Sequence, residues 1–255
     1  MLRFASLGSG SKGNGTLIEC GSTRILVDCG FTLAETERRL QRLGCSADSL
    51  SAILVTHEHG DHALGVGRLS RRYQIPVCLT VGTCKAINDK SFAQTQFINL
   101  KQSFAIGDLE ITPFSVPHDA REPCQFILSD GAIRLGILTD TGSYTDAMLE
   151  QLNGLQGLMI ECNYETEMLR RGSYPSALKE RLESRYGHLS NQQVVELLKQ
   201  LKLDKLQSLV ACHLSQINNL PEYAYAALCK GVGGERDGIK IANQLEGLDW
   251  QTLNY

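Results

Sequence analysis

Four potential metal ligands fall close together in this chain, at His57, His59, Asp61 and His62. They follow a short apolar run, Ala-Ile-Leu-Val, which predicts a buried strand. Side chains two apart on an extended chain point the same way, so His57 and His59 can bind one cation together. Gly60 is expected to let the backbone turn, so that Asp61 and His62 face a second position. Imidazole nitrogens with a carboxylate oxygen suit Zn²⁺ best, and the segment therefore predicts a metal site.

The bulk composition is that of a folded protein with no broad basic surface. A chain of 255 residues with 42% hydrophobic content can bury a proper core. Its net charge of -3 does not exclude nucleic acid, because bound dications would add positive charge where a phosphate must lie. No apolar run approaches the roughly 18–20 residues of a membrane span, so we expect no membrane segment.

The N-terminus and the cysteines indicate the cytoplasm. The first ten residues, MLRFASLGSG, contain neither the apolar region nor the cleavage pattern of a secretion signal. The 9 cysteines are odd in number and include no CxxC pair. A set of reduced thiols explains them better than a disulfide framework.

Strands and helices are expected to alternate in two similar halves, without a linker or low-complexity stretch. We therefore expect one domain over residues 1–255. Strands are predicted at residues 3–7, 16–20, 24–28, 52–55, 76–80, 96–100, 109–116, 125–128, 134–138, 158–160, 209–212 and 238–242. Helices are predicted at residues 34–43, 64–73 and 191–201, the last opened by a capping box at Ser190, and again from residue 222.

Every histidine lies in a short polar motif just after a predicted strand or just before a predicted helix. A chain with scattered core histidines would not show this pattern. Asp140 and Glu161 likewise follow predicted strands. The six histidines are His57, His59, His62, His118, His188 and His213.

The segment Thr-His-Glu-His-Gly-Asp-His matches the HxHxDH signature of the metallo-β-lactamase fold superfamily, and the chain resembles that superfamily. The resemblance implies an αββα sandwich, two mixed sheets flanked by helices, with one or two metals at one edge. Asp28-Cys29-Gly30 resembles the superfamily's Asp-x-Gly turn near the metals, where the Asp is structural.

The resemblance also assigns metal ligands and cofactors. It implies two divalent ions, Zn²⁺ in first place, with Mn²⁺ able to replace it. Two such ions roughly 3.5–4 Å apart can share a hydroxide and clamp both oxygens of a displacement. Asp140 would bridge the ions, as in glyoxalase II-like thioesterases and the superfamily's nucleases. The other ligands would be His57, His59 and His118 for one ion, and Asp61, His62 and His213 for the other.

Three residues are the catalytic candidates: Asp61, Glu161 and His188. The Ile-Glu-Cys-Asn-Tyr stretch around Glu161 and the Gly-His-Leu-Ser stretch around His188 resemble motifs of tRNase Z and β-CASP nucleases. In those families the Glu orients a His that protonates or stabilises the leaving oxygen. That role would transfer to Glu161 and His188.

Two insertions found in related nucleases have no room in this chain, which narrows the group that it resembles. The β-CASP insertion of about 150 residues cannot fit between Asp140 and His213. Too few residues separate His118 from Asp140 for the tRNA-clamping arm of some tRNase Z enzymes. The chain looks most like the small YycJ/WalJ-type proteins, which implies a DNA exonuclease and makes DNA a more favoured partner than RNA.

Two function classes remain open. The first is a dinuclear metal phosphodiesterase acting on nucleic acid, in which the glycine-rich loop bearing Ser11, Lys12 and Asn14 binds phosphates. A tight hairpin would need the same glycine-rich residues. The second is a small-molecule hydrolase of the same fold, either a thioesterase, a lactonase or a weak β-lactamase. The sequence leaves the oligomeric state open.

Overall fold

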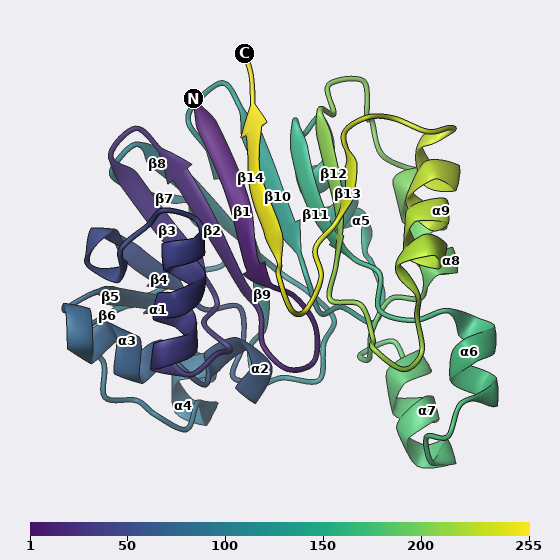
Figure 1. Ribbon diagram of the computed structural model, residues 1–255, viewed down its shortest axis with the longest axis horizontal. Coiled ribbons are helices and arrows are strands. Elements are labelled where there is room, and N and C mark those ends of the chain that lie inside the picture. Colours follow the sequence, from purple (N-terminus) through teal and green to yellow (C-terminus); the bar gives the residue numbers. More distant parts are fainter.

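Two seven-stranded β-sheets stack face to face in a computed structural model that describes residues 1–255 (Figure 1). The first sheet has the order β14-β1-β2-β3-β4-β5-β6, and the second has the order β13-β12-β11-β10-β9-β8-β7. Both sheets mix parallel and antiparallel pairs. The strands are β1 Leu2–Gly8, β2 Gly15–Cys20, β3 Thr23–Val27, β4 Ala52–Leu54, β5 Pro76–Leu79, β6 Gln94–Phe97, β7 Phe104–Ile106, β8 Leu109–Ser115, β9 Cys124–Ser129, β10 Arg134–Leu138, β11 Gly157–Glu161, β12 Ser208–Cys212, β13 Ile239–Ile241 and β14 Leu248–Leu253.

Helices cover the outer faces of both sheets, as expected for an αββα sandwich (Figure 1). The first sheet carries α1 Leu33–Arg42, α2 Gly60–Ala63, α3 Val66–Tyr73 and α4 Val81–Ala86, with the 3₁₀ turn Ala47–Ser49. The second sheet carries α5 Asp146–Leu152, α8 Asn191–Leu198 and α9 Pro221–Val232. The remaining two, α6 Thr166–Arg171 and α7 Ser176–Glu183, extend beyond the sheets at the lower right of Figure 1.

Alternation along the strands builds three apolar layers. On β3, Ile25 and Val27 point into the core between the two sheets, whereas Leu26 points toward the helices of the first sheet. On β12, Val210 joins the inter-sheet core and Leu209 packs under the helices of the second sheet. Because both faces of these strands are buried, they appear in the sequence as continuous apolar runs.

The polar motifs collect at one edge of the sandwich because all but the His188 motif, which precedes α8, follow the carboxyl end of a strand. The parallel pair β3 and β4 ends before Asp28 and the histidine motif. The parallel strand β11 ends at Glu161, and its neighbours β10 and β12 end shortly before Asp140 and His213. Carboxyl ends of parallel strands lie at the same edge of a sheet, and this brings together residues that are far apart in sequence.

Several predicted elements differ from the structure. The predicted helix over residues 64–73 forms as α3, Val66–Tyr73, and a separate short helix, α2, precedes it from Gly60 inside the histidine motif. Gly60 therefore enters a helix with an ordinary backbone conformation, and the expected glycine-dependent turn is absent. The strand expected near residues 96–100 lies at Gln94–Phe97. Strands β7 and β14 and helices α2, α4, α5, α6 and α7 were not predicted.

The αββα sandwich of two mixed sheets is confirmed. None of the helices is both long and apolar enough to span a bilayer. The single domain expected over residues 1–255 stays a prediction, and one cooperative unfolding transition would support it.

Candidate metal centre and active site

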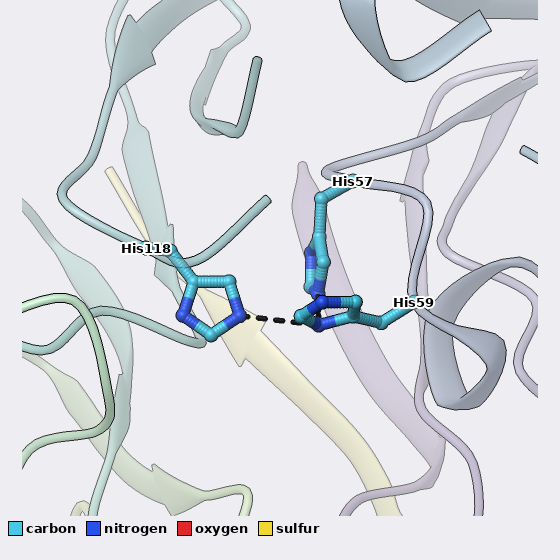
Figure 2. Close-up of side chains that lie close together, drawn as sticks. All are labelled: His57, His59 and His118. Atoms are coloured by element: carbon cyan, nitrogen blue, oxygen red, sulfur yellow. Dashed lines mark hydrogen bonds between the residues drawn. The ribbon is translucent and has the colours of Figure 1, made fainter. Parts of the chain in front are cut away.

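Three histidines from two sheets meet at the open edge of the sandwich (Figure 2). His57 and His59 come from the loop after β4, and His118 comes from the loop after β8. Nδ1 of His59 lies 3.0 Å from Nε2 of His57 and 3.3 Å from Nε2 of His118. Three ring nitrogens thus face one another across a space the size of one ion.

The protonation of these rings favours a bound cation over hydrogen bonds between the rings. Nδ1 of His118 donates to the carbonyl of Gly187 at 3.1 Å, so in a neutral ring Nε2 carries only a lone pair. Burial lowers the pKa of His118, and it lowers the pKa of His57 further, so both rings favour the neutral form. Neutral imidazoles with converging lone pairs are the donors that a divalent transition metal requires.

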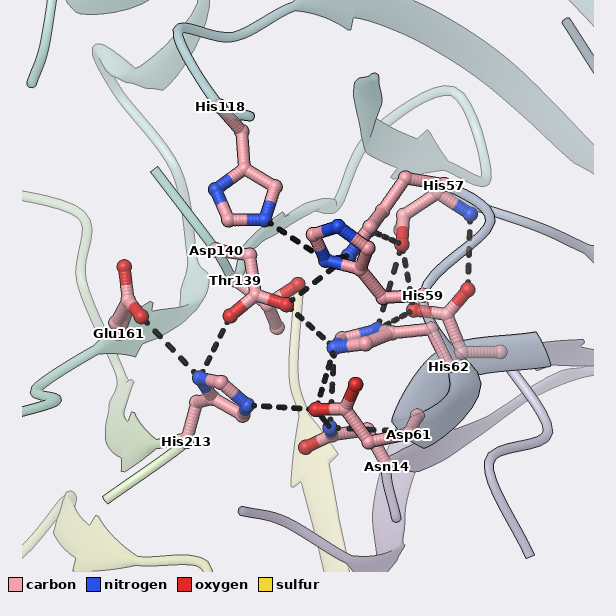
Figure 3. A network of polar contacts seen from close by, with 12 residues as sticks. Asn14, His57, His59, Asp61, His62, His118, Thr139, Asp140, Glu161 and His213 are labelled. Atoms are coloured by element: carbon pink, nitrogen blue, oxygen red, sulfur yellow. Dashed lines mark hydrogen bonds and ion pairs between the residues drawn. The ribbon is translucent and has the colours of Figure 1, made fainter. Parts of the chain in front are cut away.

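A second group of donors lies beside the first (Figure 3). Ligand atoms of Asp61, His62, Asp140 and His213 all lie within 4.8 Å of one another. Asp140 Oδ2 contacts Nε2 of His62 and also lies 3.4 Å from Nε2 of His57. Asp140 is therefore placed between the two groups, as a bridging carboxylate would be.

The charges of the second group also favour a bound cation. Burial disfavours charge on His62, but Asp140 and Asp28 outweigh it and raise the pKa of His62 well above its ordinary value. His213 shows the same opposition between burial and Asp140, and its pKa is also raised well above the ordinary value. The negative potential that draws protons onto these rings would stabilise a dication in their place.

Backbone strain is concentrated at this edge. Only four non-glycine residues have positive φ, and three of them are Asp28, Asp140 and His213, with φ of 62°, 28° and 52°. Such conformations cost on the order of 1–3 kcal/mol each and persist where the surroundings enforce them. The fold thus holds three polar side chains in orientations that an ordinary strand end would not give.

Glu161 and His188 form a tight pair next to the two groups. Oε1 of Glu161 accepts from Nδ1 of His188 at 2.6 Å, and Oε2 accepts from the backbone N–H of Thr141 at 2.9 Å. Burial disfavours protonation of His188, yet the charges and hydrogen bonds of Glu161 and Asp140 together outweigh it and raise the pKa of the ring to about 9. Both residues are also near enough to Asp140 and His213 to share an ion with them.

A cavity of about 330 Å³ opens over these residues. Its lining includes His59, Asp61, Asp140, His188 and His213, so both groups of donors reach one solvent-accessible space. A larger hollow of about 690 Å³ lies between α6, α8 and α9 and contains none of the predicted ligands.

The glycine-rich loop divides into exposed and buried residues. Ser11 lines the cavity, whereas the exposed Lys12 is not part of its lining. Asn14 is buried: its Oδ1 accepts from the backbone N–H of Gly10 at 2.9 Å, and its Nδ2 lies 3.2 Å from the carbonyl oxygen of Asp61. These bonds hold Asn14 within the protein, so its expected contact with substrate stays a prediction.

Two residues at the cavity were not predicted from the sequence. Asp119 directly follows His118, and Arg181 comes from α7. Nε of Arg181 donates to Oδ2 of Asp119 at 2.5 Å. The His-Asp dipeptide was visible as a motif, but nothing near Arg181 indicates an ion pair with a residue so distant in sequence.

Comparison with known proteins agrees with this fold. The family described as Beta-lactamase superfamily domain matches residues 23–213, and the chain belongs to that superfamily. It is 31% identical over 252 residues to the exodeoxyribonuclease YycJ of Bacillus anthracis, covering 97% of this chain and 96% of the relative. It is 33% identical over 247 residues to the exodeoxyribonuclease WalJ of Streptococcus pneumoniae, covering 94% and 91%.

The fold has a solved counterpart in the metallo-β-lactamase fold protein YhfI from Bacillus subtilis. The two superpose with a TM-score of 0.76 at 18% sequence identity, over 99% of this chain and 100% of the other. The resemblance to YycJ/WalJ-type proteins expected from the sequence is confirmed.

Proposed function

We propose that this protein is a metal-dependent phosphodiesterase that degrades nucleic acid, with DNA as the favoured substrate and exonuclease cleavage as its mode. Two relatives named exodeoxyribonucleases match the chain over nearly their whole length. The observation that carries the proposal is the Glu161–His188 pair, because it adds a held imidazole to the metal-ligand groups.

The donors fit two divalent ions. His57, His59 and His118 would hold one ion, and Asp61, His62 and His213 the other, with Asp140 shared. When bound, such ions would supply Lewis acidity toward a phosphate and an activated water as nucleophile. Zn²⁺ suits the nitrogen-rich set best, and Mn²⁺ is the replacement we expect to be tolerated.

His188 is proposed to hold the proton that the leaving oxygen needs. Its Nδ1 is engaged by Glu161, and its Nε2 makes no hydrogen bond within the protein. The ring lines the cavity and its side chain is 18% exposed, so Nε2 can meet a substrate atom. Glu161 would fix the tautomer and orientation of the ring without touching substrate.

The remaining predicted residues are proposed in supporting or binding roles. Asp61 would act as a ligand, and Asn14 would hold its backbone in place. Ser11 stays a candidate for contact with substrate because it lines the cavity. Lys12 is proposed only as a contact outside the cavity, where a longer nucleic acid would pass.

A substrate panel tests the proposal. Metal-loaded protein would be assayed with end-labelled DNA, end-labelled RNA, bis-p-nitrophenyl phosphate, S-lactoylglutathione and nitrocefin. We expect DNA to be shortened progressively from an end and bis-p-nitrophenyl phosphate to be hydrolysed. Rapid hydrolysis of the thioester or the β-lactam with inert DNA would assign the protein to the small-molecule hydrolases instead.

A further inference from the structure

Helix α7 forms one wall of the cavity although it contributes no buried residue to the core. Leu178, Arg181 and Leu182 of this helix line the cavity opposite the metal-ligand groups. In Figure 1, α7 lies with α6 beyond the end of the sandwich. A helix that buries none of its side chains adds little to the stability of the sandwich, and its position beside the site suggests a role in binding.

Arg181 is the one lysine or arginine among the residues that line the cavity. The other charged groups there include three aspartates, Asp61, Asp119 and Asp140. A phosphate entering a space rich in carboxylates needs positive charge beyond the two proposed metal ions. Arg181 supplies the only permanent side-chain cation at that surface.

The guanidinium of Arg181 is held in place and yet has donors to spare. Its Nε donates to Asp119 at 2.5 Å, while its two terminal amino groups have no hydrogen-bond partner in the protein. The side chain is 60% exposed, so those amino groups are open to a ligand. A guanidinium fork with two free amino groups can bind a phosphate oxygen pair bidentately.

Asp119 connects this guanidinium to the proposed metal site. Asp119 Oδ1 lies 3.5 Å from Nε2 of His118 and 4.0 Å from Nε2 of His59. One carboxylate thus contacts both the Arg181 guanidinium and two of the proposed metal-ligating rings. A nucleic-acid phosphate bound in this cavity would meet Arg181 and the proposed metal ligands on one lining.

We propose that Arg181 is a substrate-binding residue that takes a backbone phosphate of the nucleic acid, with Asp119 holding its guanidinium toward the cavity. This inference rests on the proposed function. The site favours a polyanion over a neutral small molecule, since Arg181 adds a cation to the cavity that the proposed metal ligands also line.

The test uses the metal-loaded full chain and a single-stranded DNA oligonucleotide, with KM measured at several salt concentrations. Arg181→Ala should raise KM about tenfold or more, with a smaller effect on kcat, because one charged phosphate contact is lost. The slope of log(1/KM) against log[salt] should become shallower by about 0.7, the value for one phosphate on a single strand. Arg181→Lys keeps the charge without the fork and should give an intermediate KM.

Arg171→Ala is the matched control. Arg171 lies on α6, its side chain is 84% exposed, and it lines the separate hollow rather than the cavity. The same loss of charge there should leave KM within twofold. The proposal is overturned if Arg181→Ala leaves KM and its salt slope unchanged, if Arg171→Ala reproduces the effect, or if Arg181→Ala strips the metal. Wild-type protein that fails to cleave DNA would instead overturn the proposed function.

Discussion

Asp28 Oδ2 accepts a hydrogen bond from Nδ1 of His62 at 2.8 Å, in the buried base of the site. The same carboxylate accepts from the backbone N–H and the hydroxyl of Thr56, each at 2.8 Å. These bonds hold a proton on Nδ1 of His62, so Nε2, which faces Asp61 and Asp140, is the nitrogen that would give up its proton to bind a metal. A carboxylate behind a metal-ligating histidine fixes its tautomer and raises its basicity.

Asp28→Asn should therefore weaken metal binding about 10- to 100-fold while leaving every ligand present. The measurement is the dissociation constant for Zn²⁺ in competition with a chelator. Asp48→Asn, at an exposed aspartate on the 3₁₀ turn, is the control and should bind metal as the wild type does. Equal affinities in all three proteins would remove Asp28 from the metal site.

Gly30 packs against Asp61 and Gly60 directly precedes it, but the two glycines differ in the space around them. A methyl group on Gly30 would lie 1.7 Å from the carbonyl oxygen of Asp61, whereas one on Gly60 would meet nothing within 4 Å. Gly30→Ala should lower the free energy of unfolding by about 1–3 kcal/mol or prevent folding, because the backbone of Asp61 must move. Gly60→Ala should change it by less than about 0.5 kcal/mol. Denaturant unfolding of both variants checks this, and similar losses would contradict the packing described here.

Glu35 on α1 should contribute to the acid stability of the fold. Hydrogen bonds from Arg38, with further ones from Arg39, lower the pKa of Glu35 to about 2, from an ordinary value of 4.5. Since the folded-state pKa is the lower one, this stabilisation is present above about pH 4.5 and is lost as the pH falls toward 2. The pair is open to solvent, with the side chain of Glu35 33% and that of Arg38 60% exposed, so screening should keep the effect below about 1 kcal/mol.

Glu35→Gln should thus lose less stability than the wild type between pH 4.5 and pH 2. Unfolding free energies at matched pH values would show it. Glu180→Gln, at an exposed glutamate of α7, serves as the control and should follow the wild-type curve. A Glu35→Gln curve parallel to the wild type would show that the arginine contacts do not persist in solution.

The sequence predicted the strands and helices that have a clear local pattern of their own. The apolar run before His57 predicts a strand and the capping box at Ser190 predicts the start of a helix. Both β4 and α8 form there. Strand β14 was missed because it is only partly buried and depends on pairing with β1 at the other end of the chain. Helix α7 was missed because a helix without buried residues leaves no apolar periodicity.

The sequence predicted the individual ligand candidates of the site but not the contacts that hold them in place. Motif matches named the ligand candidates that the structure brings together at one edge. They did not show that Asn14 is buried under Asp61, or that Arg181 pairs with Asp119. Such contacts join loops far apart in sequence, and only the packing of the two sheets determines them.

The metal content of two variants should distinguish the proposed ligand His213 from the proposed general acid His188. His213→Ala should lower the metal content, because His213 Nε2 lies 3.3 Å from Asp61 in the second group. His188→Ala should keep the wild-type content and lower turnover of DNA by roughly 10²–10⁴, the range for a lost general acid. Elemental analysis and turnover on the same preparations would decide this. Equal metal loss in both variants would make His188 a ligand.

The most direct test of the central claim compares two phosphodiesters with different leaving groups. A phenolate departs from bis-p-nitrophenyl phosphate unaided, whereas the deoxyribose oxygen of DNA needs a proton. Turnover of both substrates would be measured for wild type, His188→Ala and Glu161→Gln at equal metal loading. We predict that His188→Ala loses far more activity on DNA than on bis-p-nitrophenyl phosphate, and that Glu161→Gln shows the same selectivity more weakly. Equal losses on the two substrates would contradict the role of the Glu161–His188 pair.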